Sequence, residues 1–140
     1  MKRTPFFHTT LIVLAAITIS VVLDTYLTSG FEIGSDRIRV VDGDTVAIGD
    51  VTYRLTGYDT PETYLPRCAF EKDLGQRATN RLQALISSVE TIRIEPTGRD
   101  DYYGRELAGM MVNALNVGEI LISEGLARPY SGGKRLGWCG

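Results

Sequence analysis

The stretch from Asp42 to Glu62 constrains the fold of this 140-residue chain most strongly, because it combines two turn signals with a chain-stopping proline. Asp42-Gly43 and Gly49-Asp50 are turn pairs that separate runs of alternating apolar residues, a pattern typical of a β meander. Pro61 has no N–H and favours an extended conformation in the residue before it, so the last strand ends there. The sequence therefore predicts three antiparallel strands between Asp36 and Tyr58.

Three carboxylates and an unpaired carbonyl lie in or next to this meander. Asp44 directly follows the first turn, where its carboxylate either faces across the mouth of a barrel or is a solvated aspartate at a strand start. Asp59 precedes Pro61, and the proline leaves the Thr60 carbonyl without a ladder partner. Two carboxylates, a carbonyl and waters form an oxygen ligand set that suits Ca²⁺. Glu62 is then placed to hold or deprotonate a water beside the metal.

Two arginines complete the candidate phosphate site. Arg54 lies within the third strand, and Arg105 follows the flexible segment Tyr102-Tyr103-Gly104. The planar guanidinium binds two phosphate oxygens and stays charged. Either arginine alone is better explained as a solvated strand residue, but beside the acidic cluster the pair indicates a phosphodiester site.

Composition and missing residue types narrow the function classes. The formal net charge of −2 excludes a protein that holds nucleic acid by its overall charge, although a bound cation and placed arginines can make a pocket locally positive. His8 is the only histidine and lies in the N-terminal segment, which excludes nucleases with a histidine base and histidine-dependent triads. No Gly-Lys-Ser/Thr phosphate loop is present.

The rest of the chain predicts a small α+β fold that is mainly β. Five short strands and two helices in the order β-β-β-α-β-β-α suggest a partly open OB-type barrel with two to three helices. The elements expected after the meander are a helix from Ala69 to Val89 with Leu82, Leu85, Ile86 and Val89 on its core face, a strand from Thr91 to Glu95 stopped by Pro96, a polar loop from Thr97 to Tyr103, a strand from Leu107 to Val112, and a helix from Val117 to Glu124.

The first 30 residues are expected to be a targeting segment, which leaves residues 31–140 as one domain. Two basic residues precede an apolar run from Leu11 to Leu23, which is shorter than the roughly 20 residues of a membrane-spanning helix. A signal peptide cleaved after Gly30 is favoured, and the alternative is an uncleaved membrane anchor through residues 6–27. In both cases the domain is expected to be exported, and so periplasmic, secreted or membrane-anchored outside the cytoplasm.

Cys68 and Cys139 are the only cysteines. An even number of cysteines in an exported chain favours a disulfide, and the alternative is two free thiols. Zinc is not expected, because two cysteines without a neighbouring histidine do not complete a structural site.

Four motifs in unbroken order from Ile38 to Ala127 resemble the thermonuclease (staphylococcal-nuclease-like) family. They are D-G-D-T-V from Asp42, R-L-x-G-x-D-T-P-E from Arg54, D-x-Y-G-R-x-L-A from Asp101, and V-x-E-x-L-x-x-x-G-L-A from Val117. The resemblance implies an OB barrel with helices and a calcium-dependent endonuclease. Such an enzyme hydrolyses DNA and RNA, preferring single-stranded or unstacked substrate, and leaves 3′-phosphate and 5′-hydroxyl ends. A monomer is expected.

Carried over residue by residue, the resemblance implies a role for each of the candidate carboxylates and arginines. It implies that calcium is bound by Asp44, Asp59 and the Thr60 carbonyl, that Glu62 positions or activates the attacking water, and that Arg54 and Arg105 clamp the phosphate. The chain departs from the family by lacking its last helix, which leaves Arg67, Tyr130, Lys134 and Arg135 as the remaining substrate-backbone contacts. A rival hypothesis is a nucleic-acid-binding OB module without catalysis, but such a loss would remove carboxylates or arginines that are all present here.

Overall fold

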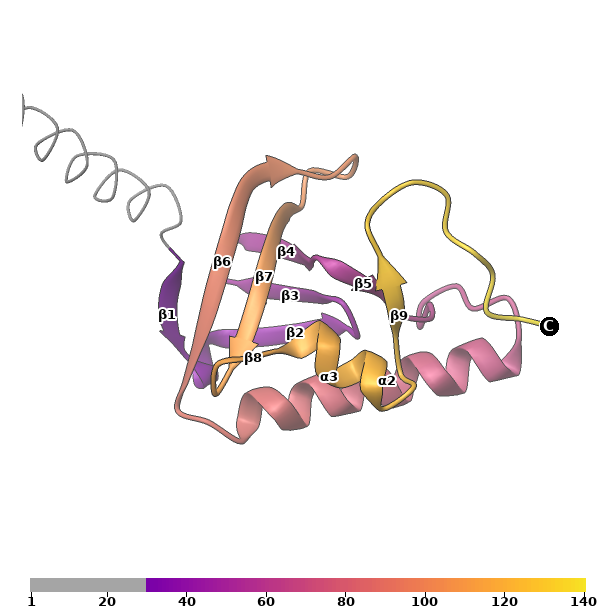
Figure 1. Ribbon diagram of the computed structural model, residues 1–140, viewed down its shortest axis with the longest axis horizontal. Coiled ribbons are helices and arrows are strands. Elements are labelled where there is room, and N and C mark those ends of the chain that lie inside the picture. Colours follow the sequence, from indigo (N-terminus) through magenta and orange to yellow (C-terminus); the bar gives the residue numbers. More distant parts are fainter. Residues whose placement is uncertain (1–29) are drawn as a thin grey trace, which may run out of the picture.

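The computed structural model describes residues 30–140, which form a curved sheet with two helices packed at its base (Figure 1). The strand order of the main sheet is β1-β6-β7-β4-β3-β2, with β8 paired to β7, and β5 and β9 form a second, two-stranded sheet. This mainly β arrangement with two helices agrees with the predicted α+β class. The elements are β1 (Phe31–Gly34), η1 (Ser35–Arg37), β2 (Ile38–Asp42), β3 (Thr45–Ile48), β4 (Val51–Leu55), β5 (Gly57–Asp59), α2 (Ala69–Ser87), β6 (Thr91–Asp100), β7 (Glu106–Val112), β8 (Leu115–Asn116), α3 (Val117–Ser123) and β9 (Arg128–Tyr130).

The expected targeting segment, with its possible anchor at residues 6–27, lies outside the described residues. Among the helices that the structure does describe, none is both long and apolar enough to cross a membrane.

The predicted three-strand meander is confirmed. β2 pairs antiparallel with β3, and β3 pairs antiparallel with β4, with Thr45 opposite Arg54. β4 then pairs in parallel with β7, and Arg54 lies opposite Leu107. This parallel pairing matters for the site, because it brings Arg105, just before β7, next to strands that lie far away in sequence.

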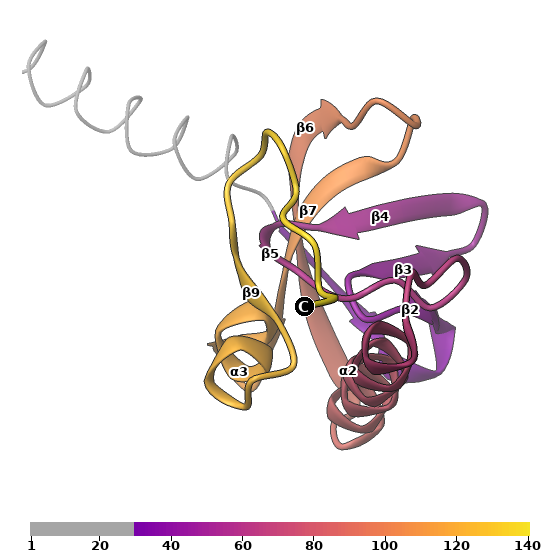
Figure 2. The same ribbon diagram turned by 90° about the vertical axis from the view of Figure 1, so that its right-hand side faces the viewer.

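The strand after α2 is longer than expected, and the prediction that it stops at Pro96 is wrong. β6 continues to Asp100, and Pro96 lies opposite Ala108 of β7. Proline is tolerated in edge strands, and β6 is an edge strand at this point because β1 pairs with it only as far as Ile94. The expected polar loop is therefore shorter, and β6 and β7 form the tall hairpin seen in Figure 2.

The structure also contains more strands than the five that the sequence predicted. Of the nine strands in the described residues, β1, β5, β8 and β9 were not expected. Each is two to four residues long, too short to show a period of two in the sequence. β1 and β8 pair with the longer strands β6 and β7, whereas β5 and β9 pair with each other.

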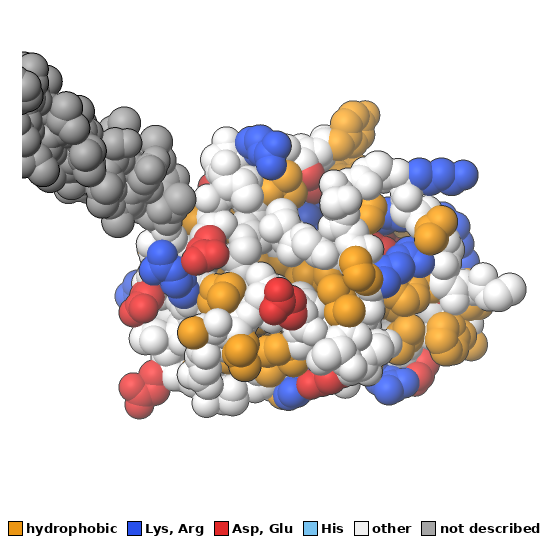
Figure 3. Space-filling model, in the orientation of Figure 1, with side chains coloured by type: hydrophobic (Ala, Val, Ile, Leu, Met, Phe, Trp, Pro, Cys, Tyr) orange, Lys and Arg blue, Asp and Glu red, His pale blue; other side chains and the backbone are white. Residues whose placement is uncertain are grey.

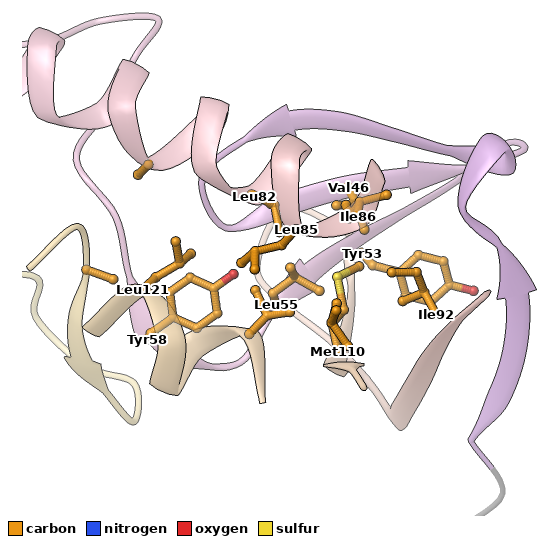
Figure 4. Packing of buried hydrophobic residues seen from close by; sticks show 14 of the residues in the cluster. Val46, Tyr53, Leu55, Tyr58, Leu82, Leu85, Ile86, Ile92, Met110 and Leu121 are labelled. Carbon is orange, nitrogen blue, oxygen red and sulfur yellow. The ribbon is translucent and has the colours of Figure 1, made fainter. Parts of the chain in front are cut away.

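The helix α2 packs its predicted apolar face on the sheet. Leu82, Leu85 and Ile86 are buried, and Figure 4 shows Leu82 and Leu85 close to Leu55 of β4. The N-terminal half of the helix buries Leu74, Gly75 and Ala78. The second helix, α3, adds Val117 and Leu121 to the same core and is capped by Asn116.

Gly75 lets α2 approach the turn that follows Asp59. A Cβ atom at this position would lie 2.7 Å from the Pro61 carbonyl oxygen and 3.1 Å from the Glu62 carbonyl oxygen. Real Cβ atoms essentially never approach backbone within 3.0 Å, so only glycine fits without a shift. The helix thereby holds the backbone that carries Thr60 and Glu62.

We expect Gly75→Ala to destabilise the protein, although alanine is the better helix former. The gain in helix propensity is about 1 kcal/mol, whereas overpacking against backbone costs about 1–3 kcal/mol. The net loss should be about 1 kcal/mol, measured by urea unfolding. Lys72→Ala, an exposed position on the same helix, is the matched control and should leave stability nearly unchanged. Equal or higher stability for Gly75→Ala would contradict this account of the contact.

The C-terminal segment is fixed at both ends. β9 pairs antiparallel with β5, with Arg128 opposite Asp59. Nine residues beyond β9, Cys139 is joined by a disulfide to Cys68, the N-cap residue of α2. The segment therefore passes over the end of the sheet where β5 lies and returns to the start of the long helix (Figures 1 and 2).

Candidate functional site

Four of the predicted site residues line one open cleft of about 1200 Å³, whereas Asp59 and Thr60 do not line it. Its lining includes Asp44, Arg54, Glu62 and Arg105, which come from the meander, the turn after β5 and the β6–β7 hairpin. Arg135 of the C-terminal segment also lines the cleft. In Figure 3, Lys and Arg side chains gather at the right-hand end of the molecule, over this segment.

Asp44 is buried, so the alternative of a solvated aspartate at a strand start is wrong. Its side chain accepts a hydrogen bond from the backbone N–H of Thr60 at 3.0 Å and one from the Thr45 hydroxyl at 3.2 Å. The Asp42 side chain accepts the N–H of Asp44, as expected for a turn former. Burial raises the pKa of Asp44 above its usual range, and the neighbouring Arg54 opposes this rise.

Asp59 is the most deeply buried carboxylate of the site, with 1% of its surface exposed. Its Oδ2 atom accepts a hydrogen bond from Arg128 at 2.9 Å. Its Oδ1 atom lies 3.2 Å from Nε of Arg135 and 3.6 Å from Arg54. Within residues 30–140, no donor makes a hydrogen bond of good geometry to this oxygen. Asp59 therefore keeps an oxygen that is surrounded by positive charge but not hydrogen-bonded.

Arg54 is also buried, so the reading of it as a solvated strand residue is wrong. One guanidinium nitrogen lies 3.0 Å from Oδ2 of Asp44 and 3.6 Å from Oδ1 of Asp59, and it donates to the Tyr58 carbonyl at 3.0 Å. Its other terminal nitrogen donates to the Leu55 carbonyl. The two aspartates therefore converge on one point, and Arg54 is fixed there by backbone carbonyls.

Arg105 is positioned by Asp101, a residue that was not predicted to have a role. The Asp101 carboxylate accepts the N–H groups of Tyr103 and Arg105 and pairs with the Arg105 guanidinium at 2.6 Å. Burial alone would raise the pKa of Asp101, but these hydrogen bonds and the Arg105 charge lower it. Arg105 also donates to the Thr45 hydroxyl at 3.2 Å, which places it beside Asp44. Asp101 is the first residue of the D-x-Y-G-R motif, and its place in this motif is the sequence feature that could have indicated a role for it.

Glu62 differs from the two aspartates because it is accessible. About half of its side chain, 53%, is exposed, and it pairs with Arg135 at 3.4 Å. A carboxylate on the rim of a cleft has access to water that a buried aspartate lacks. Its position suits proton transfer or orientation of a water.

Two further arginines reach the carboxylates from the C-terminal segment. Arg128 was not singled out in the sequence, and Arg135 was expected only to contact substrate. The pairing of β9 with β5 brings Arg128 to Asp59, and no local sequence pattern signals such a contact. Partial burial alone would lower the pKa of Arg135, but Asp59, Asp44 and Glu62 raise it, so it remains a cation.

The oxygen atoms of the site fit a hard cation. Asp44 and Asp59 converge, the Thr60 backbone is adjacent, and Oδ1 of Asp59 has no hydrogen-bond donor among the described residues. Carboxylate and carbonyl oxygens are the ligands that Ca²⁺ prefers. Among residues 30–140, the only three acidic or cysteine side chains with ligand atoms all within 4.8 Å are Cys68, Glu71 and Cys139. Because these two sulfur atoms form the disulfide, that group is not a metal site.

The chain is similar to one nuclease family and to several individual nucleases. The model of a family described as staphylococcal nuclease homologue matches residues 52–135. The SPbeta prophage-derived endonuclease YokF of Bacillus subtilis (strain 168) is 39% identical over 95 residues, which cover 64% of this chain and 32% of that protein. Endonuclease YncB of the same organism is 36% identical over 95 residues, covering 64% of this chain and 44% of that protein.

A thermonuclease of Staphylococcus hyicus is 33% identical over 96 residues, covering 65% of this chain and 56% of that protein. This chain therefore spans between about a third and just over half of the length of these relatives.

Proposed function

Because the chain belongs to the staphylococcal nuclease homologue family, we propose that it is a calcium-dependent endonuclease that hydrolyses phosphodiester bonds of DNA and RNA. One observation carries the proposal. Two buried aspartates converge on a single guanidinium nitrogen beside an open cleft whose rim carries Glu62 and Arg105. This arrangement combines a cation site, a proton acceptor and a phosphate-binding group.

Each residue has a distinct role in the proposed reaction. Asp44, Asp59 and the Thr60 carbonyl would hold the calcium ion, which when bound offsets negative charge on the phosphate as a Lewis acid. Glu62 orients the attacking water and accepts its proton. Arg105, held in place by Asp101, donates hydrogen bonds to the equatorial phosphate oxygens, and Arg54 adds positive charge from below. Attack on phosphorus in line with the 5′ oxygen leaves a 3′-phosphate and a 5′-hydroxyl.

We also propose a class of substrate and a location for the protein. A cleft with exposed Tyr102 and Tyr103 at its rim suits unpaired bases, whose faces stack on aromatic rings, so single-stranded or unstacked DNA and RNA are the proposed substrates. The Cys68–Cys139 disulfide supports export to an oxidising compartment, either as a cleaved protein or as one anchored through residues 6–27. The domain is proposed to act as a monomer.

The test is cleavage of single-stranded DNA and RNA by the oxidised protein with calcium and with a calcium chelator. Cleavage that needs calcium, and that leaves 3′-phosphate ends by end-group analysis, is the expected result. Undiminished cleavage with the chelator would refute the calcium role. The rival function, a nucleic-acid-binding module, is favoured if the protein binds single-stranded DNA but does not cleave it with calcium.

A further inference from the structure

The segment from Arg128 to Cys139, here called the strap, carries two arginines onto the candidate cation site. Both oxygens of Asp59 are contacted from the strap, Oδ2 by Arg128 at 2.9 Å and Oδ1 by Arg135 at 3.2 Å. Arg135 also reaches Glu62 at 3.4 Å. Together with Arg54, three guanidinium groups face three carboxylates, so the formal charges of the site balance without any bound ion.

The three arginines differ in how firmly they are held. Arg54 is buried and bonded to carbonyls of its own strand and of β5. Arg128 donates to the carbonyls of Leu136 and Gly137, and its guanidinium lies 4.0 Å from the Trp138 ring centroid. Within residues 30–140, Arg135 by contrast makes ion pairs only with Asp59 and Glu62, and 37% of its side chain is exposed.

Arg135 lies in a glycine-containing part of the strap, and few contacts hold its side chain. It follows Gly132 and Gly133, both in the positive φ region, and its guanidinium lies 5.7 Å from the Tyr130 ring centroid, a position within the cleft. Oδ1 of Asp59 accepts no well-formed hydrogen bond from Arg135, so release breaks two ion pairs and one long hydrogen bond, the 3.4 Å bond to Glu62. Arg135 is therefore the cation of the three that can leave with least loss of contacts.

We propose that Arg135 and the divalent cation compete for Asp59, so that the strap sets the calcium affinity of the site; this rests on the function proposed above. A calcium ion that ligates Oδ1 of Asp59 lies about 2.4 Å from that oxygen. A guanidinium nitrogen 3.2 Å from the same oxygen is then too close to a second positive charge. Binding of the ion displaces Arg135, and the free energy of that displacement lowers the affinity for calcium.

The disulfide makes the competition effective. It fixes the end of the strap four residues beyond Arg135 to the N-terminus of α2, and the pairing of β9 with β5 fixes the other end. The guanidinium is therefore kept next to the carboxylates at a high effective concentration. Cutting the disulfide releases one end of the strap, so reduction should act in the same direction as removal of Arg135.

The test is the calcium affinity of the full oxidised chain, measured by isothermal titration calorimetry on the wild type, Arg135→Gln and Lys134→Gln. Lys134 is the matched control, since it is the neighbouring cation of the strap and forms no ion pair with any residue that the structure describes. We expect Arg135→Gln to bind calcium about tenfold more tightly, within the range of typical coupling between sites. Lys134→Gln should stay within about twofold of the wild type, because exposed charges are screened.

Reduction of the wild type with dithiothreitol should also tighten calcium binding, and should change the affinity of Arg135→Gln much less. Unchanged or weaker binding by Arg135→Gln, with calcium-dependent cleavage intact in the wild type, would overturn the competition but not the proposed function. Absence of calcium binding in all three proteins would overturn both. Thermal unfolding of each variant checks that the fold is kept.

Discussion

Replacing Glu62 with glutamine is expected to lower kcat on single-stranded DNA by about a thousandfold, since a positioned proton acceptor typically contributes two to four orders of magnitude. Glutamine keeps the size of the side chain and its ability to orient a water but does not accept a proton. About half of the Glu62 side chain is exposed, and its one ion pair within residues 30–140 is with Arg135 at 3.4 Å, so its loss should not unfold the protein. The measurement is steady-state cleavage with saturating calcium.

The control for this variant is Glu119→Gln, which removes the same charge from an exposed position on α3, away from the cleft. It should cleave at the wild-type rate. If Glu62→Gln keeps more than about a tenth of the wild-type kcat, Glu62 is not the main proton acceptor. The role would then pass to bulk water or to another group on the rim of the cleft.

Removing the disulfide with the double variant Cys68→Ser, Cys139→Ser is expected to lower the free energy of unfolding by roughly 4 kcal/mol. The bond links residues 71 positions apart, and the chain-entropy model gives about this value for a loop of that length. Domains of this size have about 5–15 kcal/mol of stability in total. The loss is therefore a large fraction, and it is measured by urea unfolding of oxidised proteins.

Reduction of the wild type by dithiothreitol should reproduce the loss, whereas the double variant should not respond to the reductant. A loss below about 1 kcal/mol would show that β5–β9 pairing and core packing hold the strap without the bond. The two predictions also separate two roles of the C-terminal segment. Glu62→Gln tests chemistry at the rim of the cleft, and the disulfide variant tests the attachment of the segment that faces it.

The local sequence was sufficient for the elements that depend on neighbours along the chain. Turn pairs at Asp42-Gly43 and Gly49-Asp50 predicted the meander, and the apolar spacing of Leu82, Leu85 and Ile86 predicted the face that α2 buries. These signals work because turn geometry and helical period depend on residues a few positions apart. The wrong end of β6 at Pro96 shows the limit, because whether a strand tolerates proline depends on which edge is free.

Part of the candidate site could likewise be predicted from the local sequence, and part of it could not. The stretch from Asp42 to Glu62 by itself determined a cluster of carboxylates and an arginine, because the residue types and the proline are encoded there. Only the tertiary structure showed that Arg54 is buried between Asp44 and Asp59, that Asp101 positions Arg105, and that Arg128 and Arg135 both pair with Asp59. The physical reason is that charges interact through space. Strand pairing and the disulfide decide which charges meet, and those contacts join residues up to 76 positions apart.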